Sequence, residues 1–187
     1  MYLPLNDLKM HVKIEGEGHP LLVLHGFTGS SVTWAPFFLS WQRSYQVIAP
    51  DLIGHGQTDS PKRTERYTMN RAVEDLVSLL DKLGIAKTRL LGYSMGGRLG
   101  LAFAASYPER VASLLLESSS PGLETETERL QRVKRDEALA DQIVQDGIEA
   151  FVEKWENVPL FSTQSDEIKA SLREQRLQNR RGGLAGS

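Results

Sequence analysis

A single serine lies between glycines in the stretch Gly92-Tyr93-Ser94-Met95-Gly96. A short apolar run of the kind that forms a buried strand precedes it, and a run with helical spacing follows it. In this context a G-x-S-x-G pattern predicts a sharp strand-to-helix turn that raises the serine hydroxyl above the sheet. The helix dipole then favours negative charge that develops at the hydroxyl. Ser94 is therefore the candidate reactive residue, and a merely structural Gly-Ser turn is the alternative.

A second glycine-bordered loop, His25-Gly26-Phe27-Thr28-Gly29, also follows a short apolar run. The carboxyl ends of parallel strands form the ligand crevice of an α/β sheet. Backbone N–H groups of Phe27 and Met95 are thus the expected oxyanion hole, in which one donor is worth roughly 2.7–4 kcal/mol in the transition state. We interpret His25 and His55 as residues that hold loops by hydrogen bonds, with a role as catalytic base as the alternative.

Short runs rich in β-forming residues alternate with helical patterns in the first part of the chain, and only helical patterns follow. The predicted strands cover residues 11–15, 21–24, 45–49, 89–91 and 111–116, and the predicted helices cover 34–41, 68–83 and 95–107. Strands separated by helices imply an α/β fold with a mostly parallel sheet flanked by helices. Charge-dense helices are predicted at 129–147, 148–155 and 166–178. We therefore expect a core over residues 1–120 and a helical lid over residues 121–187.

The amino-acid composition excludes several classes of function. The 187 residues carry a formal net charge of −2 and include no cysteine. Disulfides and cysteine-based metal sites or catalysis are thereby excluded, and nothing points to a nucleic-acid partner. No segment is apolar enough to insert into a membrane, and the first residues do not form a secretory signal. We expect a cytoplasmic protein without a cofactor or a metal.

Six stretches together resemble the α/β-hydrolase superfamily and, within it, the 2-succinyl-6-hydroxy-2,4-cyclohexadiene-1-carboxylate synthases of menaquinone biosynthesis. They are LHGFTGSSVTW (24–34), DLIGHGQTDSP (51–61), LLGYSMGGRLGLAFA (90–104), ERVASLLLESSSPGL (109–123), FVEKWENVPLF (151–161) and RLQN (176–179). The serine motif alone indicates only the superfamily. GYSMGGR combined with ESSSPGL and WENVPLF is more specific, and the six stretches span nearly the whole chain.

The resemblance implies a lyase. Ser94, activated as part of a triad, would act as the base that leads to elimination of pyruvate from 2-succinyl-5-enolpyruvyl-6-hydroxy-3-cyclohexene-1-carboxylate. This substrate carries several carboxylates, which the planar fork of an arginine binds with two hydrogen bonds. The family's substrate-binding positions match Arg98, Arg132 and Arg176, and Trp155 and Tyr93 are candidate pocket walls. Solvated arginines and simple aromatic packing are the alternatives.

The histidines stand in an unexpected place for this fold, in which the nucleophile precedes the acid and the acid precedes the histidine. All four histidines precede Ser94, and none follows Gly122. The resemblance implies that the acid and the histidine lie on later strands, so we expect this sequence to be the first part of such an enzyme. Alone it is expected to have little activity, and to associate with itself or with a polypeptide that completes the domain. The alternatives are a carboxylic-ester hydrolase and a non-catalytic binding remnant.

Overall fold

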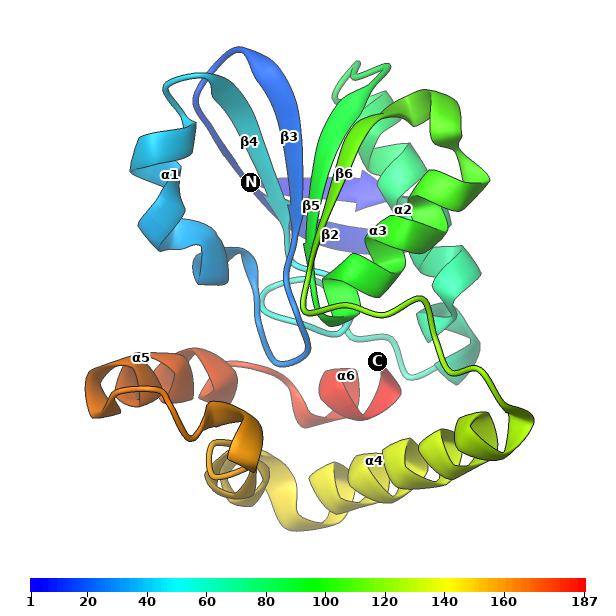
Figure 1. The fold of residues 1–187 in the computed structure, drawn as a ribbon, viewed down its shortest axis with the longest axis vertical. Coiled ribbons are helices and arrows are strands. Elements are labelled where there is room, and N and C mark those ends of the chain that lie inside the picture. The colour runs from blue at the N-terminus through cyan, green and yellow to red at the C-terminus, as the bar shows by residue number, and fades with distance from the viewer.

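A six-stranded sheet forms the centre of the computed structural model, which describes residues 1–187 (Figure 1). Its strands are β1 (Tyr2–Leu5), β2 (Leu8–Glu15), β3 (His19–Leu24), β4 (Tyr45–Pro50), β5 (Thr88–Tyr93) and β6 (Val111–Glu117). They lie in the order β1-β2-β4-β3-β5-β6. Pairing is antiparallel between β1, β2 and β4 and parallel from β4 through β3 and β5 to β6. The predicted mostly parallel sheet is confirmed, with β1 as a strand that the sequence did not indicate.

Helices cover both faces of the sheet: α1 (Ala35–Trp41) lies on one side, and α2 (Met69–Lys82) and α3 (Met95–Ser106) lie on the other (Figure 1). Successive side chains of a strand point to opposite faces. On β3, Val23 accordingly packs in the cluster that includes Phe38 of α1. Leu22 and Leu24 pack in the larger cluster, which includes Leu76 of α2 and Phe103 of α3. β3 is therefore apolar on both faces, as its sequence predicted.

The last third of the chain forms a layer of helices across the sheet end at which β3 and β5 terminate (Figure 1). We call it the helical segment; it comprises α4 (Glu126–Trp155), the short 3₁₀ helix η4 (Pro159–Phe161), α5 (Asp166–Leu177) and α6 (Arg181–Gly186). A capping box between Thr125 and Glu128 begins α4. Gly147, with φ 86° and ψ 173°, divides α4 into two helical halves. The break lies where the sequence predicted one helix to end and another to begin.

Buried apolar side chains join the helical segment to the sheet end. Ile143, Phe151 and Val152 of α4 form a buried cluster with Leu184 of α6, and Phe27 packs against this cluster from the loop after β3. The short helix α6 was not predicted from the sequence. Three further 3₁₀ turns, η1 (Ser31–Trp34), η2 (Thr64–Tyr67) and η3 (Pro108–Arg110), lie in the connections. None of the helices combines the length and the apolar composition that a membrane span needs.

Candidate active site

Ser94 occupies the sharp turn between β5 and α3 that the motif predicted. Its backbone has φ 52° and ψ −113°, a positive φ that costs of order 1–3 kcal/mol for a residue with a side chain. Three hydrogen bonds hold this geometry: the Ser94 N–H donates to the Glu117 carbonyl (2.9 Å), and the Ser94 carbonyl accepts from the Arg98 N–H (3.1 Å) and the Ser119 hydroxyl (3.0 Å). The end of β6 thus supports the strained turn.

The glycines around Ser94 are required by close contacts between backbones. A side-chain carbon on Gly92 would lie 2.5 Å from the Gly97 Cα, and one on Gly96 would collide with the carbonyl oxygens of Leu24 and His25. One on Gly97 would collide with the Ser119 hydroxyl. The start of α3 can therefore approach the ends of β3 and β6 only because these positions carry no side chain.

Gly97→Ala is expected to lower the free energy of unfolding by about 1–3 kcal/mol, because the added methyl overlaps the Ser119 hydroxyl that supports the Ser94 carbonyl. Urea unfolding followed by circular dichroism measures the change. The matched control is Gly182→Ala, whose added carbon would have no neighbouring atom within 4 Å. Equal stability of the Gly97→Ala variant and the unchanged protein would contradict the close contact.

The loop of residues 25–29, here called the oxyanion loop, lies directly against the serine turn. A side-chain carbon on Gly26 would be 2.8 Å from the Tyr93 ring and 3.4 Å from the Ser94 Cβ. The Phe27 N–H donates no hydrogen bond within the chain. Met95 begins α3, so its N–H has no partner inside the helix. Two free backbone donors therefore border the serine turn, and their role as an oxyanion hole stays a prediction.

His25 is fully buried and uses both ring nitrogens to hold loops. Its Nδ1 lies 2.8 Å from the Gly26 carbonyl oxygen and therefore carries the proton, and its Nε2 accepts from the Leu52 N–H at 2.9 Å. Burial lowers the pKa of His25, although the Gly26 carbonyl and the charge of Asp51 act in the opposite direction. These are the loop-holding contacts that the sequence suggested, and they leave neither nitrogen free to take a proton from Ser94.

His55 is also buried, with its ring centre 5.1 Å from that of His25. Its Nδ1 lies 3.1 Å from the Ile53 carbonyl oxygen and donates to it, and its buried Nε2 has no hydrogen-bond partner. Burial, together with the neighbouring His25, lowers the pKa of His55 to about 3. His55 is therefore neutral at physiological pH. Neither this ring nor that of His25 forms a hydrogen bond with the Ser94 hydroxyl.

The two buried histidines give the stability a pH dependence of known sign. In the unfolded chain His55 takes up a proton near the ordinary histidine pKa of 6.5, whereas the folded chain resists protonation until pH falls to about 3. The free energy of unfolding should therefore decrease as pH falls from 6.5 toward 3, by up to about 1.4 kcal/mol per pH unit for such a histidine. Urea unfolding at pH 7, 6, 5 and 4 measures the slope, which His55→Asn should reduce. An unchanged slope in a folded His55→Asn variant would contradict this account.

Arg176, on α5, is a buried arginine without an ion-pair partner. Its side chain is only 4% exposed, its guanidinium lies 4.8 Å from the Phe161 ring centre, and its buried Nη1 has no hydrogen-bond partner. Burial lowers the pKa of Arg176, while Glu156 and Tyr93 act in the opposite direction. The nearby Glu156 pairs with Arg173 instead. A buried cation without an anion is costly, so this site is suited to bind an anionic ligand.

The other two predicted arginines have different surroundings. Arg98 is exposed on α3, one turn after Ser94. Its side chain forms no hydrogen bond within the chain, so it is free to bind a ligand. Arg132 on α4 is half exposed and pairs with Asp136 of its own helix at 2.7 Å. Such an i,i+4 pair is typical of a solvated helix surface. The binding roles of both residues stay predictions.

Trp155 links the helical segment to the oxyanion loop. Its ring centre lies 5.4 Å from that of Phe27 and 5.6 Å from that of Phe151, and its buried Nε1 has no partner. A small cavity of about 210 Å³ lies beside it, lined by Leu139, Gln142, Asp146, Phe151, Lys154, Trp155 and Val158. Phe27 also carries one of the two free N–H groups beside Ser94. Trp155, which packs on Phe27, therefore covers the site on the side of the oxyanion loop.

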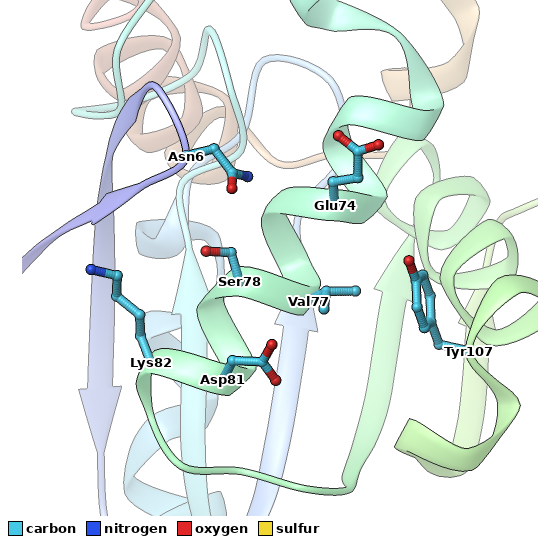
Figure 2. A pocket seen from close by; sticks show the side chains of 7 residues that line it. All are labelled: Asn6, Glu74, Val77, Ser78, Asp81, Lys82 and Tyr107. Carbon is cyan, nitrogen blue, oxygen red and sulfur yellow. The ribbon is translucent and has the colours of Figure 1, made fainter.

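A larger hollow, of about 500 Å³, lies elsewhere on the molecule. Figure 2 shows it between the turn after β1, the exposed face of α2 and the end of α3, and its lining includes Asn6, Glu74, Ser78, Lys82 and Tyr107. It contains none of the predicted site residues. The serine turn, identified by backbone strain and free donors, is therefore the better candidate for the active site than this hollow.

Two groups of residues at the site were not predicted from the sequence. Asp51 accepts hydrogen bonds from the Ser31 and Gln57 N–H groups at 2.6 and 2.9 Å. Burial raises the pKa of Asp51, but these hydrogen bonds outweigh burial and bring it below its usual value. Gln175 contacts the hydroxyls of Ser30 and Thr33, and Asn179 bonds to two loops. Asn179 lies in the RLQN stretch, which was singled out for its arginine, and Gln175 lies just before that stretch.

Comparisons with known proteins place this geometry in a family. A family model described as alpha/beta hydrolase fold matches residues 19–181. The putative 2-succinyl-6-hydroxy-2,4-cyclohexadiene-1-carboxylate synthase of Bacillus subtilis is 48% identical over 170 residues, which are 89% of this chain and 62% of the relative. The chain thus spans less than two thirds of that relative's length.

Two solved structures share the fold. MenH from S. aureus superposes with a TM-score of 0.87 at 36% identity, over 94% of this chain and 68% of that chain. The enol-lactonase from Burkholderia xenovorans LB400 has a TM-score of 0.85 at 22% identity, over 100% of this chain and 71% of that chain, which shows the common fold alone. The chain belongs to the alpha/beta hydrolase fold family, and the resemblance to its 2-succinyl-6-hydroxy-2,4-cyclohexadiene-1-carboxylate synthases is confirmed.

Proposed function

We propose that this chain carries the reactive serine and the carboxylate-binding part of a lyase of menaquinone biosynthesis. The reaction is the elimination of pyruvate from 2-succinyl-5-enolpyruvyl-6-hydroxy-3-cyclohexene-1-carboxylate, which leaves 2-succinyl-6-hydroxy-2,4-cyclohexadiene-1-carboxylate. The relatives from B. subtilis and S. aureus support this assignment. The observation that carries it is the buried, unpaired guanidinium of Arg176 close to Tyr93, the residue before Ser94.

The serine acts here as a base and forms no acyl enzyme. Once a general base takes its proton, the Ser94 oxygen removes a proton from the cyclohexene ring. The electron pair of the C2–H bond forms the C2=C3 double bond, the existing C3=C4 pair shifts to C4=C5, and the C5–O bond to the enolpyruvyl group breaks. The departing enolate takes up a proton and becomes pyruvate. The Phe27 and Met95 N–H groups would stabilise the negative charge that develops on oxygen.

Fixed cations hold the substrate for this step. Arg176 is the main candidate, since a carboxylate would supply the anion that its buried guanidinium lacks. Arg98 is the second candidate, because it lies one helical turn from Ser94. The helical segment acts as a lid, with Trp155 packed on Phe27 at its edge. Closure over the site would exclude water, which strengthens these charge interactions.

The test is a pyruvate-release assay on the protein as its own gene encodes it. Ser94→Ala should abolish turnover, and Arg98→Ala should reduce kcat/KM by about 10- to 150-fold, the effect of losing a charged hydrogen bond. Arg135→Ala is the matched control, because Arg135 is an exposed arginine that bonds only to its own helix. Ester hydrolysis without pyruvate release, lost in Ser94→Ala, would instead identify a carboxylic-ester hydrolase.

A further inference from the structure

The side chain of Asn179, just beyond α5, bridges two loops that are far from it in sequence. Its Nδ2 donates to the Thr28 carbonyl at 2.9 Å, and its Oδ1 accepts from the Gly56 N–H at 2.9 Å. A second bond from Nδ2 to the Arg176 carbonyl, at 3.2 Å, fixes the amide against its own helix end. Asn179 is only 5% exposed, so these bonds are shielded from water.

The contact with Thr28 matters because the oxyanion loop is strained there. Residues 26–29 form a turn closed by a bond from the Gly29 N–H to the Gly26 carbonyl (3.0 Å), and Thr28 has φ 68°. Turns with a positive φ at the third residue normally use glycine, and a β-branched residue is strongly disfavoured there. The Thr28 carbonyl has no partner other than Asn179. This bond therefore stabilises a turn that the residue itself disfavours.

The contact with Gly56 ties the same turn to the loop of His55. Gly56 also has a positive φ, of 50°. The ring centres of Phe27 and His55 lie 5.9 Å apart, so the two loops already pack together. One turn earlier on α5, Gln175 contacts the hydroxyls of Ser30 and Thr33. The end of α5 thus contacts the oxyanion loop at Thr28 and the residues just after it at Ser30 and Thr33.

We propose that Asn179 is a positioning residue that keeps the Phe27 N–H directed at the reacting oxygen by holding Thr28 in its strained conformation. It acts through the turn and does not touch the substrate. This rests on the oxyanion role of Phe27 in the proposed function. Because Arg176 lies at the same helix end, the end of α5 positions both the Arg176 guanidinium and, through Thr28, the Phe27 N–H.

Amide exchange and ¹H–¹⁵N chemical shifts of the 187-residue chain test the proposal without any turnover. Asn179→Ala should raise the exchange rate of the Gly29 amide about three- to tenfold, the effect of losing one ordinary hydrogen bond. It should also shift the Phe27 and Thr28 amide signals. Asn179→Asp should disturb the turn in the same way, because a carboxylate cannot donate to the Thr28 carbonyl. It should leave the Gly56 amide bonded, since a carboxylate oxygen still accepts.

Two further variants separate positioning from general packing. Gln178→Ala, at an exposed neighbouring position, should leave all these signals unchanged. Thr28→Gly combined with Asn179→Ala should restore slow Gly29 exchange, because glycine adopts a positive φ without strain. Unchanged Gly29 exchange in Asn179→Ala or Asn179→Asp, or changes spread evenly over the sheet, would overturn the proposal even if the protein releases pyruvate. A failed pyruvate assay would overturn the proposed function and leave this result standing.

Discussion

The purified 187-residue chain is expected to release pyruvate from the enolpyruvyl substrate only at a small residual rate. None of its histidines forms a hydrogen bond with Ser94: His25 uses both ring nitrogens, and His55 donates to Ile53 and is neutral. A serine without a base has the proton affinity of an alcohol. Binding and oxyanion donors alone leave a residual of about 10³–10⁴ over the reaction in water.

Coupled detection of pyruvate on mass-verified protein measures this rate. Adding 4-methylimidazole as a soluble base should raise the residual rate only in the protein that retains Ser94. The Ser94→Ala variant is the control. Robust turnover that disappears in Ser94→Ala and also in His25→Ala or His55→Ala would show that one of the two buried histidines is the base. His25 would then have to give up a loop contact, whereas His55, whose Nε2 has no partner, would have to come within hydrogen-bonding reach of Ser94.

Arg176→Met is expected to change binding and stability in opposite directions. Removing the guanidinium should weaken binding of succinate, a probe for the succinyl carboxylate of the substrate, by about 10- to 150-fold. The free energy of unfolding should rise by about 1–3 kcal/mol, because an unpaired buried charge is replaced by an apolar side chain of similar length. Calorimetric titration and urea unfolding measure the two effects.

Variants at two positions sharpen this result. Arg176→Lys keeps a charge but not the planar fork, so it should bind succinate more weakly than the unchanged protein and more strongly than Arg176→Met. Arg180→Met, at an exposed position close in sequence, should alter neither quantity. Loss of stability in Arg176→Met without loss of succinate binding would mean that Arg176 only packs against Phe161.

Most of the fold could be predicted from local sequence patterns. The strands and helices around Ser94 were predicted because apolar spacing is a property of neighbouring residues, and the glycines on both sides of the serine mark a turn that only small residues permit. The oxyanion loop was predicted for the same reason, as a glycine-bordered loop at a strand end. In contrast, β1 and α6 are short, and their sequences have too few residues for a period to show.

The difference between Arg132 and Arg176 was decided by tertiary structure. Both lie in charge-dense helical sequence, although Arg132 has Glu128 and Asp136 four residues away and Arg176 has no acidic residue three or four positions away. Packing leaves Arg132 on a solvated surface beside Asp136, whereas it buries Arg176 against Phe161 while Arg173 takes the nearby Glu156. The charge spacing indicates the i,i+4 pair of Arg132, but the burial of Arg176 depends on which helix face meets the sheet end, and the spacing of charges does not reveal that.

The bond between Asn179 and Thr28 is the clearest case of a feature that sequence patterns cannot contain. It joins residues 151 positions apart, and it makes a strained threonine acceptable where a turn would normally need glycine. The sequence alone determined that a serine would stand at a strand-to-helix turn, because that geometry follows from adjacent residues. Which distant side chains hold the loop opposite that serine follows only from the way the helical segment packs across the end of the sheet.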